Sequence, residues 1–263
     1  MAFLLLSFAL VAATAHLVRP AVASGQPIAL ARFDGRGVVA VFVIIVAAAM
    51  LLGLGPALAL MLAFLVKELG HVLGYRLAGH DDARLRLLPL PSGPPISDRA
   101  PAGDLAAFFI LLMGPVFGLA PMIAAFALGA AFAETAPAFA DAARAYALAA
   151  GALNFVALLP VWPLPGGRLT RMVIEARFPA VGGLAAAALC AFTLGLAVTW
   201  SSALLFLLGL VGGLALVVRP AGPVARARLS RAQTRIAFTA YFATLAAYFL
   251  AGWWVLKLLP LWG

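Results

Sequence analysis

Three ionisable residues inside one apolar stretch are the strongest chemical signal in the sequence. Lys67, Glu68 and His71 lie within the mostly apolar run from Pro56 to Ala78. A charge near the middle of a membrane-spanning helix costs roughly 2.5–3.5 kcal/mol, so such residues usually face a protein interior and mark a site. On a helix, Lys67 and His71 share a face, whereas Glu68 lies about 100° around the axis from Lys67.

The spacing of these residues is one substitution away from a zinc-binding motif. With histidine in place of Lys67, the segment ending at His71 would read His-Glu-Leu-Gly-His. In that pattern two histidines at i and i+4 hold zinc, and the glutamate between them activates a water molecule. The function of the chain therefore depends on what the absence of the first histidine means.

The elements that position these residues are predicted to be apolar helices. Of the 263 residues, 65% are hydrophobic and only 10% are charged, and apolar runs near twenty residues recur along the chain. This pattern predicts an all-α polytopic membrane protein in contact with the lipid bilayer. The net charge of +9 comes from basic residues dispersed between the apolar runs, which is typical of membrane-protein loops and does not favour a nucleic-acid partner.

About eight runs are predicted to span the membrane. The first is also signal-like, because Ala21-Val22-Ala23 resembles a cleavage site, and its removal would leave seven spans. We expect it to be retained, because with eight spans and both termini outside, all the strongly basic loops fall on the cytoplasmic side. The eight runs cover residues 2–18, 38–55, 56–78, 104–131, 140–160, 180–199, 201–218 and 236–259.

Two of the loops carry unusual backbone signals. Residues 84–91 begin with alternating arginine and leucine and end in prolines, a pattern compatible with an edge strand or with an irregular loop. Residues 160–167 hold three prolines and two glycines, which predicts that they do not form regular helix. This second segment either lies at membrane depth, covered by protein or water, or follows a helix that ends at the interface.

Four segments occur in an order that matches a known family. They are Glu68-Leu-Gly-His71, the run Leu-Leu-Pro-Leu-Pro at 87–91, the apolar run 108–115 ending in Gly-Pro, and Leu-Leu-Pro-Val-Trp-Pro-Leu-Pro-Gly-Gly-Arg at 158–168. Together they resemble the site-2 protease family of intramembrane zinc metalloproteases, whose members carry H-E-x-G-H, a short strand in the bacterial proteins, an apolar run ending in Gly-Pro, and N-L-x-P-x-x-P-L-D-G-G-R.

The resemblance implies a helix bundle of the site-2 protease type in a bacterial inner (cytoplasmic) membrane. It implies a family-like core at about residues 56–178, followed by C-terminal helices over 180–263. We expect residues 1–23 to form a short helix or signal-like segment. We expect 24–263 to form a single membrane domain.

The same resemblance places non-ligating residues where the family binds zinc. In the family, two histidines and the aspartate of L-D-G hold zinc, and the glutamate is the general base. His71 and Glu68 match, whereas Lys67 replaces the first histidine and Pro165 replaces the aspartate. A catalytic zinc needs three protein ligands and an open position, so we expect a vestigial site with no cofactor. The remaining motif positions are Ala157, in place of the family's asparagine, and the possible supporting residues Asn154, Gly166 and Gly167.

Lys67 needs an explanation of its own under this interpretation. We expect its ammonium to lie where the family holds zinc, neutralised by Glu68, with His71 accepting a hydrogen bond. A paired lysine in the interior is much less costly than a lone one. The alternative is that Lys67 extends along its helix to the cytoplasmic interface.

Three functions are compatible with the sequence, and we favour the first. It is a proteolytically inactive relative that binds transmembrane segments, as a regulator, assembly factor or accessory subunit of a membrane-protein complex. The second is an active protease whose zinc is held by non-standard ligands, for which the candidates are His80, Asp81 and Asp82, past the expected helix end, and His16 on another helix. The third is a transporter that uses the ionisable residues as a proton or substrate site, although no inverted repeat is visible.

Overall fold

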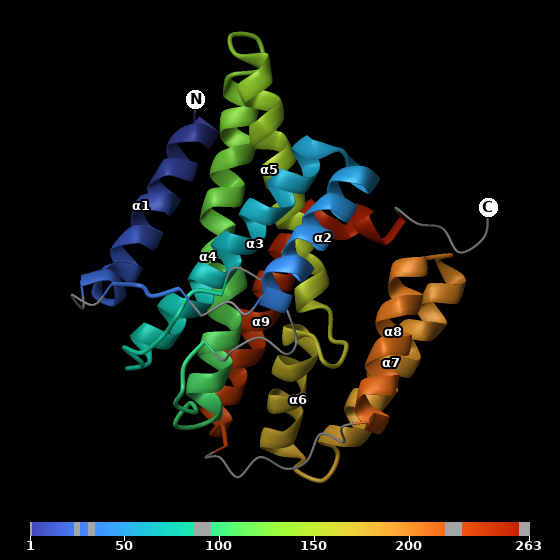
Figure 1. Ribbon diagram of the computed structural model, residues 1–263. Helices are drawn as coiled ribbons and strands as arrows, with labels where there is room; N and C mark the ends of the chain where they lie inside the picture. The colour runs from blue at the N-terminus through green and yellow to red at the C-terminus, as the bar shows by residue number, and fades with distance from the viewer. Residues whose placement is uncertain (1, 24–26, 31–34, 87–95, 219–227, 258–263) are drawn as a thin grey trace. The chain divides into compact units, whose positions relative to one another are not determined.

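The computed structural model describes residues 2–23, 27–30, 35–86, 96–218 and 228–257 (Figure 1). Within these ranges the chain is helical and forms no strand. Its elements are α1 (Ala2–Ala23), α2 (Gly35–Leu52), α3 (Leu54–Leu77), α4 (Asp104–Ala131), α5 (Pro137–Leu158), α6 (Pro165–Arg177), α7 (Gly182–Thr199), α8 (Ala203–Val218), α9 (Arg231–Gly252) and the 3₁₀ helix η1 (Trp253–Lys257).

The helices bear out the predicted class of an α-helical polytopic membrane protein. In the described part of the chain, five helical segments are long and apolar enough to cross a membrane: α1, α3, α4, α7, and α9 continued by η1. The other predicted spans are also helical, as α2, α5 and α8, but they do not meet the same criterion of length and composition. The count of eight spans therefore stays a prediction.

Contacts divide the chain into two compact units. The first comprises Met1–Ala100 and Met113–Leu153, and the second comprises Pro101–Leu112 and Asn154–Gly263. The single membrane domain expected over 24–263 stays a prediction.

Two tight turns join helices that pack against each other. Gly53, with φ of 86°, separates α2 from α3, and its left-handed conformation is one that glycine adopts without steric cost. Ser201, with φ of 51°, lies between α7 and α8. The first turn joins two neighbouring helices of the first unit and the second turn joins two of the second unit (Figure 1). A short connection of this kind is typical of helices that pack as neighbours.

In the first unit, the end of α3 is held to the end of α1. Val18 and Ala21 of α1 pack with Leu73 of α3 in one apolar cluster. The buried guanidinium of Arg76 donates hydrogen bonds to the carbonyls of Ala21 at 3.3 Å and Pro27 at 3.1 Å. A cation at the C-terminal end of α1 also interacts favourably with the helix dipole.

In the second unit, the proline-rich segment after α5 is irregular only in part. The chain leaves helical geometry after Leu158 and enters α6 at Pro165. The expectation of no regular helix over 160–167 is therefore wrong for its last three residues, because proline at the first helical position loses only an N–H that has no partner there. A Cβ atom at Gly166 would collide with the carbonyl of Leu158, so the start of α6 lies directly against the end of α5.

The segment that follows α3 makes only a minimal strand-like contact. Leu85 forms an isolated parallel bridge with Leu30, and its N–H donates to the carbonyl of Ala29 at 2.9 Å. The neighbouring Arg84 N–H donates to the carbonyl of Ile96 at 2.8 Å. The Leu-Leu-Pro-Leu-Pro run at 87–91 lies outside the described residues, so an edge strand there stays a prediction.

Candidate functional site

The three ionisable residues of the predicted motif lie on one uninterrupted helix, α3. The helix begins after Gly53 and continues to Leu77, so Lys67 lies about 15 Å from its C-terminal end at 1.5 Å per residue. Glu68 and His71 are only 3% and 6% exposed, whereas Lys67 is partly exposed. The helix therefore carries two nearly buried polar groups and one that is more accessible.

His71 lies against a glycine of α4 at the close approach of the two helices. A Cβ atom at Gly114 would collide with the imidazole of His71. One residue earlier on α3, a Cβ atom at Gly70 would lie 2.8 Å from Cβ of Phe117 and 2.9 Å from Cα of Gly114. Small residues allow helices to approach this closely in membranes. The structure thus brings together two of the four sequence segments, Glu68–His71 and the Gly-Pro end of 108–115.

The carboxylate of Glu68 is bound by an arginine from outside the helix. Nε of Arg86 donates a hydrogen bond to Oε2 of Glu68 at 3.1 Å and forms an ion pair with it. The Glu68 side chain is 3% exposed and that of Arg86 is 27% exposed. The buried charge of Glu68 is therefore compensated by a charge-assisted hydrogen bond.

Arg86 reaches Glu68 because the chain turns back after α3. Gly79, with φ of 87°, reverses its direction in a left-handed conformation. Beyond it, Ala83 and Leu85 pack in one apolar cluster with Val72 of α3. The returning segment therefore runs beside the last turns of α3. Its course places the guanidinium of Arg86 next to the carboxylate of Glu68.

Arg86, and not the expected Lys67, forms the ion pair of Glu68 among the described residues. We expected Lys67 to neutralise it, but no ion pair joins these two residues in the part of the chain that the structure describes. Consecutive side chains on a helix diverge by about 100°, whereas Arg86 approaches from a separate segment. Sequence reasoning treated Arg86 only as a loop charge. The available signal was the Arg-Leu-Arg alternation that begins at Arg84.

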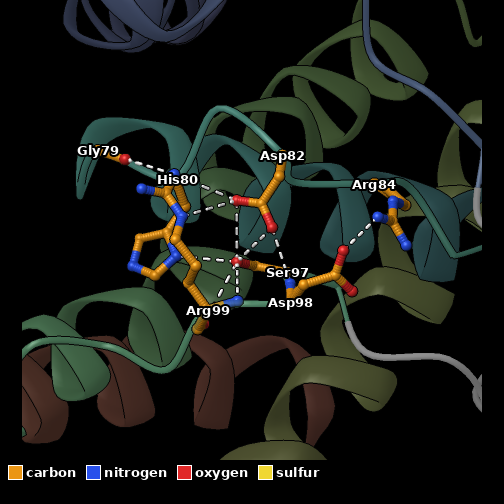
Figure 2. A network of polar contacts seen from close by, with 7 residues as sticks. All are labelled: Gly79, His80, Asp82, Arg84, Ser97, Asp98 and Arg99. Atoms are coloured by element: carbon orange, nitrogen blue, oxygen red, sulfur yellow. Dashed lines mark hydrogen bonds and ion pairs between the residues drawn. The ribbon is translucent and has the colours of Figure 1, made fainter.

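A second polar network surrounds Ser97, whose side chain is buried like that of His80 (Figure 2). Ser97 Oγ lies 2.9 Å from Nδ1 of His80 and donates to the carboxylate of Asp82 at 3.0–3.1 Å. The Asp98 N–H donates to the same carboxylate at 2.7 Å, and Arg99 donates to it at 3.3 Å. The network ties residues just after α3 to residues 97–99.

The order of groups in this network indicates a structural role. In a nucleophilic triad, histidine lies between serine and the carboxylate, and the carboxylate orients the histidine. Here Ser97 lies between His80 and Asp82, so the carboxylate binds the serine hydroxyl directly. The arrangement joins two ends of a loop and does not prepare the hydroxyl for attack.

Asp82 is stabilised in its charged form by this network. Its partial burial opposes ionisation, but the hydrogen bonds from the backbone of Asp98 and the side chains of Ser97 and Arg99 together outweigh that effect. They hold the pKa of the Asp82 carboxyl below its ordinary value of 3.8. Two of the three alternative metal-ligand candidates, His80 and Asp82, are thus bound to Ser97.

The other predicted site residues lie in the second unit. Asn154 is 1% exposed in α5, and Ala157 follows it by about one turn. Pro165 is the first residue of α6 and has no side-chain donor atom. A Cβ atom at Gly167 would collide with the backbone of Val161, so both glycines of the motif pack against the turn between α5 and α6. The proximity of this group to Lys67, Glu68 and His71 stays a prediction.

No protein-family model, curated protein or solved structure matches this chain. A functional conclusion therefore rests on the residues and their geometry. The geometry consists of a buried carboxylate neutralised by an arginine, a partly exposed lysine beside it, and a histidine packed on a neighbouring helix.

Proposed function

We propose that the chain is a proteolytically inactive relative of the site-2 proteases that binds transmembrane segments of other proteins. It acts as a regulator, an assembly factor or an accessory subunit of a membrane complex. The observation that carries the proposal is the ion pair of Glu68 with Arg86, next to Lys67 at the position of the family's first histidine. In the family the glutamate serves a zinc-bound water, whereas here its carboxylate is bound by a guanidinium.

The donor set does not fit a catalytic zinc ion. Such a site needs three protein ligands and one open position. His71 is the one matching nitrogen ligand, Pro165 has no donor atom, and the ammonium of Lys67 repels a cation. The candidate replacements His80 and Asp82 are hydrogen-bonded to Ser97. No hydrolytic step is therefore derived from this site.

A binding role is supported by the packing that persists around the altered residues. The contact of Gly70 and His71 with Gly114 needs two glycines at matched positions on α3 and α4. The five membrane-length apolar helices support an integral membrane location, and we infer a bacterial inner membrane from the family resemblance. Fold resemblance alone does not establish activity, so the site residues decide between the proposals.

The test is the zinc content of the purified full-length protein, measured by plasma mass spectrometry. We expect well below one zinc per chain, with the same amount in a His71→Ala variant. An Asp141→Asn variant is the matched control, because Asp141 is an exposed carboxylate of α5 that is not among the candidate ligands. About one zinc per chain, lost in His71→Ala and retained in the control, would overturn the proposal in favour of an active metalloprotease.

A further inference from the structure

Lys67 forms no ion pair with a carboxylate among the described residues, although the charge of the adjacent Glu68 acts on it. Five ion pairs among the described residues each join a carboxylate to an arginine. These pairs are Glu68–Arg86, Asp82–Arg99, Asp98–Arg84, Asp141–Arg144 and Glu175–Arg171. The cluster of Lys67, Glu68 and Arg86 therefore holds two cations and one anion, an excess of one positive charge (2 − 1).

The position of Lys67 makes this excess unfavourable within a membrane helix. Charged groups inside a membrane are costly and are normally paired with one another. Lys67 is about 15 Å from the C-terminal end of α3, which is further than a lysine side chain extends. Glu68 is already bound by Arg86 through a directional hydrogen bond. A second anion would neutralise the remaining positive charge of the cluster.

Lys67 lies on the inner side of α3. On the helix, Lys67 shares a side with Ala63 and His71, which are buried, and lies opposite the highly exposed Leu58. Even so, Lys67 remains partly exposed, unlike its neighbour Glu68. The Glu68 carboxylate is already covered, so Lys67 is the more accessible of the two charged residues.

We propose that Lys67 binds a carboxylate supplied by another protein, an Asp or Glu side chain within the partner's transmembrane helix. This inference rests on the proposed function and adds the chemistry of the bound segment. Lipid headgroups lie at the membrane interface, whereas Lys67 lies well inside α3, so the matching anion is one carried by a helix. The partner's acidic residue completes the charge balance of Lys67, Glu68 and Arg86.

The test uses the full-length protein in phosphatidylcholine vesicles and synthetic polyleucine transmembrane peptides. Each peptide carries one Asp, Asn or Leu at its centre and a dansyl group that accepts energy from the five tryptophans of the chain. We expect the Asp peptide to bind roughly tenfold more tightly than the Leu peptide. Lys67→Met should remove this difference, and Lys67→Arg should retain most of it. Lys257→Met, at the chain's other lysine, should leave it unchanged.

The outcomes separate this inference from the proposed function. Equal binding of the Asp and Leu peptides, unaffected by Lys67→Met, would overturn the inference that the partner is acidic. It would leave the proposed binding of transmembrane segments in place. Binding of none of the peptides would count against both. A Lys67-dependent signal that appears only after anionic lipid is added would overturn the inference in favour of a headgroup. The melting temperature of each variant verifies that it remains folded.

Discussion

Nε of Arg86 lies 3.1 Å from Oε2 of Glu68, so a residue of the returning segment neutralises a carboxylate on α3 that is 3% exposed. This contact links the end of α3 to the chain that follows it. It also occupies the carboxylate that the resemblance to site-2 proteases matches with the family's general base. The consequences for stability and for the neighbouring Lys67 are open to direct measurement.

Arg86→Leu is expected to destabilise the protein by about 1–3 kcal/mol. The substitution leaves the Glu68 carboxylate buried without its partner, and the cost is less than for a fully buried pair because Arg86 is partly exposed. Thermal unfolding in detergent measures the effect. The double variant Glu68→Leu/Arg86→Leu should recover part of the loss, because no unpaired charge then remains in the pair.

The control for this prediction is Arg84→Leu, two residues earlier. Its partner Asp98 is largely exposed, so the substitution should cost no more than about 1 kcal/mol. Equal losses of stability for Arg84→Leu and Arg86→Leu would show that the Glu68–Arg86 pair contributes no more to stability than the exposed pair.

Lys67→Met is expected to leave the melting temperature unchanged or to raise it. With Glu68 bound to Arg86, the substitution removes an uncompensated ammonium from an apolar helix and replaces it with a side chain of similar length. A clear fall in melting temperature, measured at the same pH and in the same detergent, would instead indicate that Lys67 has a stabilising partner within the chain.

Gly114→Ala is expected to destabilise the first unit by about 1–3 kcal/mol, the usual cost of overpacking. The added Cβ would collide with the imidazole of His71, and α3 and α4 would have to move apart. Gly195→Ala in α7 is the matched control, because a Cβ there meets no atom within 4 Å. Because alanine is the better helix former, the control should be neutral or stabilising in thermal unfolding.

The Asp82 carboxylate predicts a pH-dependent contribution to stability. Its pKa is lower in the folded state than its ordinary value of 3.8, so the contribution is complete well above that value and is lost as the pH falls below it. Asp82→Asn should therefore lower the melting temperature at pH 7, and the difference from the unsubstituted protein should shrink below about pH 4.

Asp81→Asn is the matched control for this pH dependence. Asp81 is adjacent and exposed, and it takes no part in the Ser97 network drawn in Figure 2. It should change the melting temperature little at either pH. A difference for Asp82→Asn that stays constant between pH 7 and pH 3 would contradict the role assigned to its charged form.

The positions of the helices followed from local features of the sequence. Apolar runs near twenty residues predicted the helices, and the boundary expected between residues 55 and 56 lies two residues earlier, at Gly53. These features can be predicted from the sequence because the length and hydropathy of a run, and the turn residues that end it, determine structure locally. The start of α6 at Pro165 was missed, because the same proline that ends a helix also suits a first helical position.

The partners of the polar side chains were decided by tertiary structure. The sequence placed Lys67, Glu68 and His71 on one helix, but it did not indicate that Glu68 would be bound by Arg86 or that His71 would lie against Gly114. Both contacts depend on how separate segments approach each other. The contact of Glu68 with Arg86 depends on the reversal of the chain after α3, and the contact of His71 with Gly114 depends on the close packing of α4 against α3. Residue types and spacing determine which groups share a helix, whereas the path of the chain determines which charges meet.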